Sequence, residues 1–226
     1  MCGIPNGTLL EIIGQDGVGK SSVLFTIAGQ AMAQGSPFFY VETENKLMDE
    51  ARVKRCLNTD PTVAEKMYSL ITSQQCDDIP SMVTAIEDFA DSCRNNGVPM
   101  NVPIVCAVDS FSKLMSPTES VGRSFYSGSD AGKKEFGTDK VNFGHAKFAH
   151  QWCRILPSWL RQKHVILLVV SHQNQKVDTG FGGGSFMSAD VAASYNRTKI
   201  GGNAFNQNAA LQIILTRKGF AKQGTE

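Results

Sequence analysis

The chain of 226 residues has no excess of charge of either sign, since its formal net charge is +1 at pH 7. A balanced charge gives no global reason to bind nucleic acid or a membrane, so any basic surface must be local. No segment reaches the roughly 18 apolar residues of a membrane span. The start of the chain also lacks the basic residues and apolar run of a signal peptide. We therefore expect a soluble protein of the cytoplasm.

The sequence also lacks paired cysteines and internal repeats. Its six cysteines are scattered, and none stands in a Cys-X-X-Cys pattern, which argues against a disulfide framework. Cys106 and Cys153 lie in apolar patterns and are predicted to be buried thiols. The four histidines have no metal-ligand spacing with cysteines or carboxylates, so we interpret them as structural or surface residues.

What the chain does contain is the segment GQDGVGKSS at residues 14–22, which fits the phosphate-loop pattern G-x-x-x-x-G-K-[ST]. Residues 8–13 predict a strand before it, and residues 21–33 predict a helix after it. Such a turn directs backbone N–H groups at a phosphate, and the helix dipole adds to the attraction. Lys20 is predicted to reach the β- and γ-phosphates and Ser21 to ligate Mg²⁺. The predicted nucleotide contacts are Gly14, Gln15, Asp16, Gly17, Val18, Gly19, Lys20, Ser21 and Ser22.

Strand and helix patterns alternate along the rest of the chain. Strands 104–108 and 165–170 are apolar throughout, which is typical of strands buried on both faces. The alternation predicts one α/β domain over residues 1–226, with a mostly parallel, twisted sheet and helices on both faces. Pro157 predicts a kink, or the start of a second piece, in the last helix. The other predicted strands are 38–41, 67–71 and 209–215, and the helices are 47–57, 79–95 and 145–162.

Polar residues follow several of these strands, at the edge where ligands bind in such sheets. Asp109 follows a buried strand and is predicted to hold Mg²⁺ through water; the alternative is a helix-capping or turn aspartate. Glu44 is the predicted general base for the attacking water, and Glu42 competes for that role. Gln173 is predicted to contact the γ-phosphate and report it to the next loop, unless it merely caps the strand.

Two long segments, 116–143 and 174–200, carry no helix or strand pattern. Loops of this length are either functional or disordered. Both combine basic with aromatic residues, a mixture that suits the phosphates and bases of nucleic acid. The first segment also carries acidic residues, so composition alone leaves nucleic-acid contact open.

Five segments resemble the ATPase core of the RecA recombinases of bacteria and phages. Residues 3–22 resemble that family's entry strand and phosphate loop. Residues 38–49 resemble its second strand with the catalytic glutamate, here Glu44. Residues 104–114 resemble its Walker B strand, with Asp109. Residues 144–173 resemble the helix and strand that end in the family's allosteric glutamine, here Gln173. The most specific similarity is the Gly-Gly-Asn-Ala run at 201–204, which closes the family's second DNA-binding loop.

The resemblance implies a RecA-like fold and a DNA-dependent ATPase that uses ATP and Mg²⁺. It implies binding of single-stranded DNA, self-association into a filament or ring, and strand exchange in homologous recombination and DNA repair, in a bacterial cell or phage-infected host. We expect the family's N-terminal polymerisation arm and C-terminal part to be absent from this chain. The two long segments correspond to the DNA-binding loops. The implied DNA contacts are Arg123, Arg197, Lys199, Gly201, Gly202 and Asn203.

Two other functions use the same phosphate loop. A RecA-fold switch or helicase-like module would act on a protein partner without strand exchange, and it need not carry the run at 201–204. A small-molecule kinase would need an acceptor pocket and an arginine-rich lid. The sequence contains no such arginine cluster, which ranks the kinase last.

Overall fold

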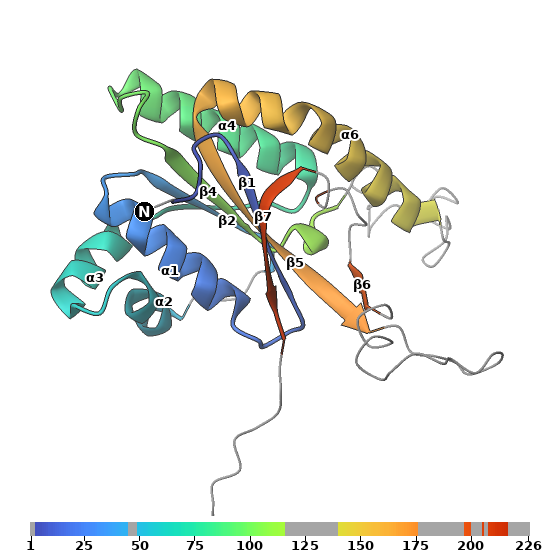
Figure 1. Cartoon of the computed structure of the whole chain (residues 1–226), viewed down its shortest axis with the longest axis horizontal. Helices are drawn as coiled ribbons and strands as arrows, with labels where there is room; N and C mark the ends of the chain where they lie inside the picture. Colours follow the sequence, from blue (N-terminus) through green and yellow to red (C-terminus); the bar gives the residue numbers. More distant parts are fainter. Residues whose placement is uncertain are drawn as a thin grey trace, which may run out of the picture.

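The computed structural model describes residues 3–44, 49–115, 140–175, 197–199, 205 and 208–216, with the backbone alone for 140–149, 173–175 and 197–199. Within these ranges, six parallel strands form one sheet in the order β3-β2-β4-β5-β1-β7 (Figure 1). A short strand, β6, pairs antiparallel with the end of β5. The strands are β1 (Leu9–Gly14), β2 (Phe38–Glu42), β3 (Thr72–Gln75), β4 (Ile104–Asp109), β5 (Val165–Gln175), β6 (Arg197–Lys199) and β7 (Ala209–Leu215).

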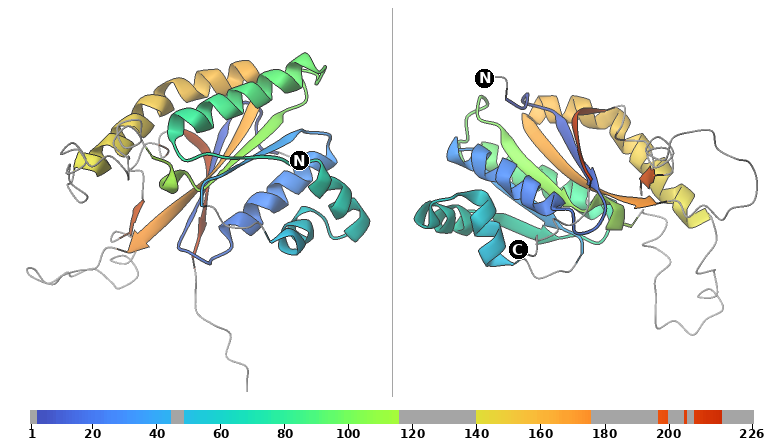
Figure 2. Two further views of the ribbon diagram at one scale, coloured as in Figure 1. Left: turned by 180° about the vertical axis from the view of Figure 1, so that it is seen from behind. Right: turned by 60° about the horizontal axis from the view of Figure 1, so that its bottom comes forward.

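Helices cover both faces of the sheet (Figures 1 and 2). Helices α1 (Lys20–Ala33), α2 (Glu50–Leu57) and α3 (Pro61–Ser69) pack on one face, and α4 (Ile79–Asn95) and α6 (Lys140–Lys163) pack on the other. Successive strand residues point to opposite faces, so each strand contributes to two cores. The predicted α/β class and parallel sheet are confirmed, and the arrangement is consistent with a RecA-like core.

Most predicted elements agree with the structure. Helix α4 and strand β7 have the predicted bounds. Strands β4 and β5 are buried over their apolar stretches, as expected for strands covered on both faces. The side chains of Cys106 and Cys153 are also buried, as predicted. None of the helices in the described ranges is long and apolar enough to span a bilayer.

The predicted strand at 67–71 is wrong. Helix α3 ends at Ser69, and the edge strand β3 begins only at Thr72. The carboxylate of Asp60 caps α3 by accepting hydrogen bonds from the N–H groups of Thr62 and Val63, and Pro61 stands in the first turn. This Asp-Pro start is a helix signal that outweighs the weak apolar run. Strand β3 is exposed throughout, so it carries no alternating pattern.

The two segments without pattern are shorter than predicted. Helix α6 begins at Lys140 and continues through Pro157 as one helix, so the proposed start of a second piece there is wrong. Strand β5 runs on to Gln175 and pairs with β6, inside the second predicted loop. Residues 116–139 and 176–196 lie outside the described residues.

A buried polar contact ties together the three strands beside the phosphate loop. Glu11, in the middle of β1, is fully buried. One of its carboxylate oxygens accepts a hydrogen bond from Ser171 Oγ of β5 at 2.7 Å, and the other accepts one from Gln212 Nε2 of β7 at 2.7 Å. Hydrogen-bonded partners offset the cost of burying a carboxylate. The contact therefore holds β1 in a defined position between its neighbours.

Candidate functional site

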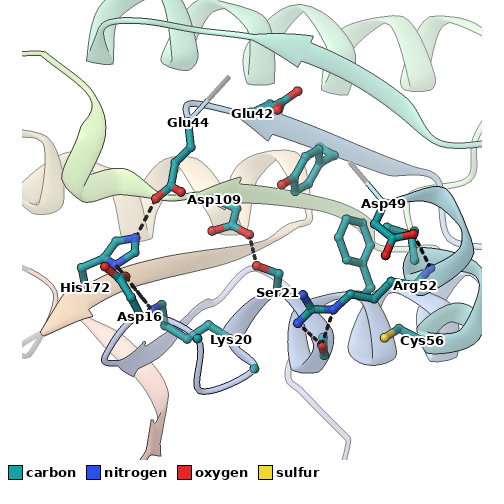
Figure 3. Close-up of a pocket in the computed structure, with 16 residues that line it drawn as sticks. Asp16, Lys20, Ser21, Glu42, Glu44, Asp49, Arg52, Cys56, Asp109 and His172 are labelled. Atoms are coloured by element: carbon teal, nitrogen blue, oxygen red, sulfur yellow. Dashed lines mark hydrogen bonds and ion pairs between the residues drawn. The ribbon is translucent and has the colours of Figure 1, made fainter. Parts of the chain in front are cut away.

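A cavity of about 310 Å³ lies at the carboxyl edge of the sheet (Figure 3). The phosphate loop, the start of α1, the ends of β2, β4 and β5, and helix α2 all contribute side chains to it. Lys20, Ser21, Glu44 and Asp109 lie together there, as the positions of the predicted strand ends require. Ligands of parallel α/β sheets bind at this edge, so the cavity is the candidate site.

Backbone geometry shapes the phosphate loop. Gly17 and Gly19 have φ angles of 74° and 97°, a left-handed conformation that glycine adopts readily. Gly14 is required for a different reason, because a Cβ there would lie 2.8 Å from the carbonyl oxygen of Leu215 in β7. The first turn of α1 contains no acidic residue, so its positive end is compatible with an anion. The loop therefore has the form of an anion-binding turn.

The amine of Lys20 lies inside this turn. It donates hydrogen bonds to the carbonyl oxygens of Gly14 at 3.0 Å and Gln15 at 2.8 Å, and the residue is only 6% exposed. Burial lowers the pKa of Lys20, while the nearby carboxylates, first that of Asp16, act in the opposite direction. The ammonium is thus held at the centre of the loop by backbone oxygens.

Ser21 and Asp109 meet between α1 and β4. Ser21 Oγ donates a hydrogen bond to Asp109 Oδ2 at 2.6 Å. Burial raises the pKa of Asp109, and the Ser21 hydrogen bond partly counters this rise. A hydroxyl and one carboxylate fit Mg²⁺, which takes a few protein oxygens and completes its shell with phosphates and water. Within the described ranges, no cluster of three or more His, Cys, Asp or Glu residues could hold a metal ion.

Glu44 is held by two partners, one just after β4 and one in β5. Its Oε1 accepts a hydrogen bond from Ser110 Oγ at 3.1 Å and lies 2.8 Å from Nε2 of His172. Glu42 also lines the cavity, at the end of β2. His172 therefore contacts Glu44 directly.

His172 is a cavity residue that histidine spacing gave no reason to place there. It is 8% exposed, its Nδ1 contacts the carboxylate of Asp16, and the same nitrogen lies 3.5 Å from the amine of Lys20. The imidazole thus connects the phosphate loop with Glu44 (Figure 3). A usable signal was its position at the end of a buried strand, because alternation turns one of two adjacent residues toward the cavity.

Helix α2 forms the opposite wall of the cavity. Arg52 donates to Ser22 Oγ from Nη2 at 2.8 Å and from Nε at 3.3 Å. Asp49 and Cys56 line the same wall, and the Phe25 ring extends it from α1. These side chains were also missed by sequence reasoning, because nothing local in 49–56 indicates that this helix faces the phosphate loop.

The predicted sensor and DNA contacts are described only in part. Gln173 pairs through its backbone with Lys199, and Gln175 pairs with Arg197, which makes the β5–β6 ladder continuous with the strand end that carries His172. The other predicted DNA contacts lie outside the described residues; they are Arg123, Gly201, Gly202 and Asn203.

Comparisons with known proteins agree with the resemblance seen in the sequence. No family model matches the chain. The chain is 23% identical over 224 residues to the RecA protein of Pseudomonas fluorescens strain SBW25 and to that of Pseudomonas syringae pv. syringae strain B728a. The alignments cover 99% of this chain but 52% and 51% of the two relatives, so the chain spans about half the length of the curated relatives it matches. These matches support a RecA-like relationship.

Proposed function

We propose that this chain binds ATP and Mg²⁺ and hydrolyses the nucleotide, and that single-stranded DNA stimulates the reaction. The observation that carries the proposal is the convergence of Lys20, the Ser21–Asp109 pair and Glu44 on one cavity. A phosphate-binding turn, an oxygen pair suited to Mg²⁺ and a carboxylate are the parts that phosphoryl transfer to water needs.

The phosphate loop binds the nucleotide through backbone N–H groups and Lys20. The amine exchanges its hydrogen bonds to the Gly14 and Gln15 carbonyls for bonds to phosphate oxygens, which are stronger acceptors because they are charged. Mg²⁺, when bound by Ser21 and through water by Asp109, neutralises charge on the phosphates. The loop and the oxygen pair thus hold the phosphate chain in place for attack.

Glu44 acts as the general base in this proposal. It accepts the proton of a water molecule whose oxygen bonds to the γ-phosphorus, while the bond from that phosphorus to the ADP oxygen breaks. Ser110 and His172 position the carboxylate through the contacts at 3.1 and 2.8 Å. His172 is therefore a positioning residue that also reaches the phosphate loop through Asp16.

We propose that the end of β5 couples the nucleotide to DNA. Gln173 senses the γ-phosphate, and its ladder partners Lys199 and Arg197 contact the DNA backbone together with Arg123. Gly201, Gly202 and Asn203 close the same DNA-binding segment. We further propose filament assembly and strand exchange in recombination and repair in the cytoplasm, prompted by the RecA-like relationship that the matches support.

The affinity of the chain for a fluorescent single-stranded oligonucleotide tests the coupling. We expect tight binding with a slowly hydrolysed ATP analogue and weaker binding with ADP. Replacing Arg197 and Lys199 together by alanine should reduce the slope of log affinity against log salt by about one to two. Affinity that is independent of the nucleotide would contradict the proposal.

A further inference from the structure

We propose that Arg52 is a second phosphate-binding cation of the site, contacting the α-phosphate end of the nucleotide from within the same chain. The proposal rests on the nucleotide binding proposed above and adds a residue outside the phosphate-loop motif. It concerns affinity for the nucleotide and not the chemical step.

Helix packing fixes the position of Arg52. The carboxylate of Asp49 caps α2 by accepting the backbone N–H of Arg52 at 3.2 Å. Val53 and Leu57 of the same helix are buried in the core. Gly29 of α1 permits a close approach, because a Cβ at that position would clash with the carbonyl oxygen of Leu57. The end of α2 is thereby held against α1, and the Arg52–Ser22 contact places the start of α2 beside the first turn of α1.

The guanidinium of Arg52 points at the anion-binding end of α1. Two of its donors, Nη2 and Nε, converge on the single hydroxyl oxygen of Ser22. A planar guanidinium matches two oxygens of a phosphate, and an anionic oxygen is a better acceptor for it than a hydroxyl. By accepting both hydrogen bonds, Ser22 holds the Arg52 guanidinium at the place where a phosphate would approach the helix.

The layout of the cavity indicates which phosphate this is. Figure 3 shows His172 and Glu44 at one end, Arg52 at the other, and the Ser21–Asp109 pair between them. In a phosphate loop the lysine serves the β- and γ-phosphates, and the γ-phosphate must face the base. The end remote from Glu44 is therefore the α-phosphate end.

A contact to the α-phosphate has a distinct functional signature. ATP and ADP both carry this phosphate, so the contact should stabilise both complexes equally. Uniform binding of this kind changes KM and leaves kcat unchanged. A cation acting at the γ-phosphate would instead distinguish ATP from ADP and affect the rate of hydrolysis.

Calorimetric titration of Arg52→Ala with Mg²⁺ and either ADP or a slowly hydrolysed ATP analogue tests the proposal. We expect about a tenfold loss of affinity for both nucleotides, and a partial recovery in Arg52→Lys, which keeps the charge but loses the fork. Arg55→Ala is the matched control, since Arg55 is an exposed arginine of the same helix that does not line the cavity. Its affinities should equal those of the wild type.

The outcomes separate this proposal from the function on which it rests. Unchanged affinity in Arg52→Ala, or a loss for the ATP analogue alone, overturns the role of Arg52 while nucleotide binding stands. If the wild-type chain itself binds neither nucleotide, the proposed function fails as well. Circular dichroism and thermal unfolding of Arg52→Ala must match the wild type, because an affinity lost through unfolding would appear as a lower midpoint.

Discussion

The two ends of the cavity are built from different parts of the fold. Glu44 follows β2 and His172 lies in β5; both are mostly buried, and they contact each other. Arg52 stands on an exposed helical surface and reaches the site with a long side chain. Burial and mutual contact restrict the positions of these two side chains, which suits a proton transfer. A helix surface can supply a cation whose contribution is affinity, so the two ends should respond differently to substitution.

The largest effect is expected at Lys20, whose amine lies in the phosphate loop beside His172. Replacing Lys20 by alanine removes the buried cation of the phosphate loop and leaves its carbonyl partners without their donor. Nucleotide affinity and hydrolysis should both fall, the latter by about a hundredfold or more. Steady-state phosphate release and nucleotide titration measure the two losses. Hydrolysis at the wild-type rate would place the reaction elsewhere.

Substitution of the two glutamates separates the reactive end from its surroundings. Glu44→Gln removes the proposed base while keeping its shape, so hydrolysis should fall about a hundredfold with nucleotide affinity retained. Glu42→Gln is the matched control at the neighbouring position and should have a much smaller effect. A larger loss of hydrolysis in Glu42→Gln than in Glu44→Gln would assign the base to Glu42.

A change that moves α2 sharpens the comparison, because it should affect only the Arg52 end. Gly29→Ala introduces a Cβ that clashes with the backbone of Leu57. The overpacking should lower the free energy of unfolding by about 1–3 kcal/mol. Nucleotide affinity should fall as well, with kcat nearly unchanged. Chemical denaturation measures the first effect, and Gln30→Ala, at an exposed position of α1, is the control.

The smallest effect concerns thiol reactivity at the Arg52 end. Burial raises the pKa of Cys153 to about 12, and it also raises the pKa of Cys106. Both thiols therefore stay protonated at pH 8, so their alkylation should be slow. Cys56 is only partly buried and lines the cavity, so it should react faster, and ADP should slow its reaction. Mass spectrometry of the alkylated peptides measures the relative rates of alkylation. Equal labelling of Cys56 with and without ADP would show that Cys56 does not lie beside the bound nucleotide.

The parts of the site that could be predicted are those encoded by continuous local patterns. The phosphate loop needs its glycines, lysine and serine in one run, and Asp109 follows a run of five apolar residues. Edge strand β3 escaped prediction because an exposed polar strand has no apolar alternation. Helix α3 was missed because the prediction followed the weak apolar run at 67–71 and overlooked the Asp60-Pro61 helix start.

The contacts that join the site could not be predicted, because they depend on strand order and helix packing. His172 reaches Asp16 only because β5 lies next to β1, with His172 in register with Gly14. Arg52 reaches Ser22 only because α2 packs closely on α1. Parallel pairing joins distant segments, and no local pattern encodes it.

The most direct measurement of the central claim is phosphate release by the purified chain with Mg²⁺ and ATP, followed with and without single-stranded DNA. We predict hydrolysis that DNA accelerates and that Lys20→Ala abolishes under both conditions. Release no faster than that of Lys20→Ala, with DNA present, would contradict the assignment of this cavity as a DNA-stimulated ATPase site.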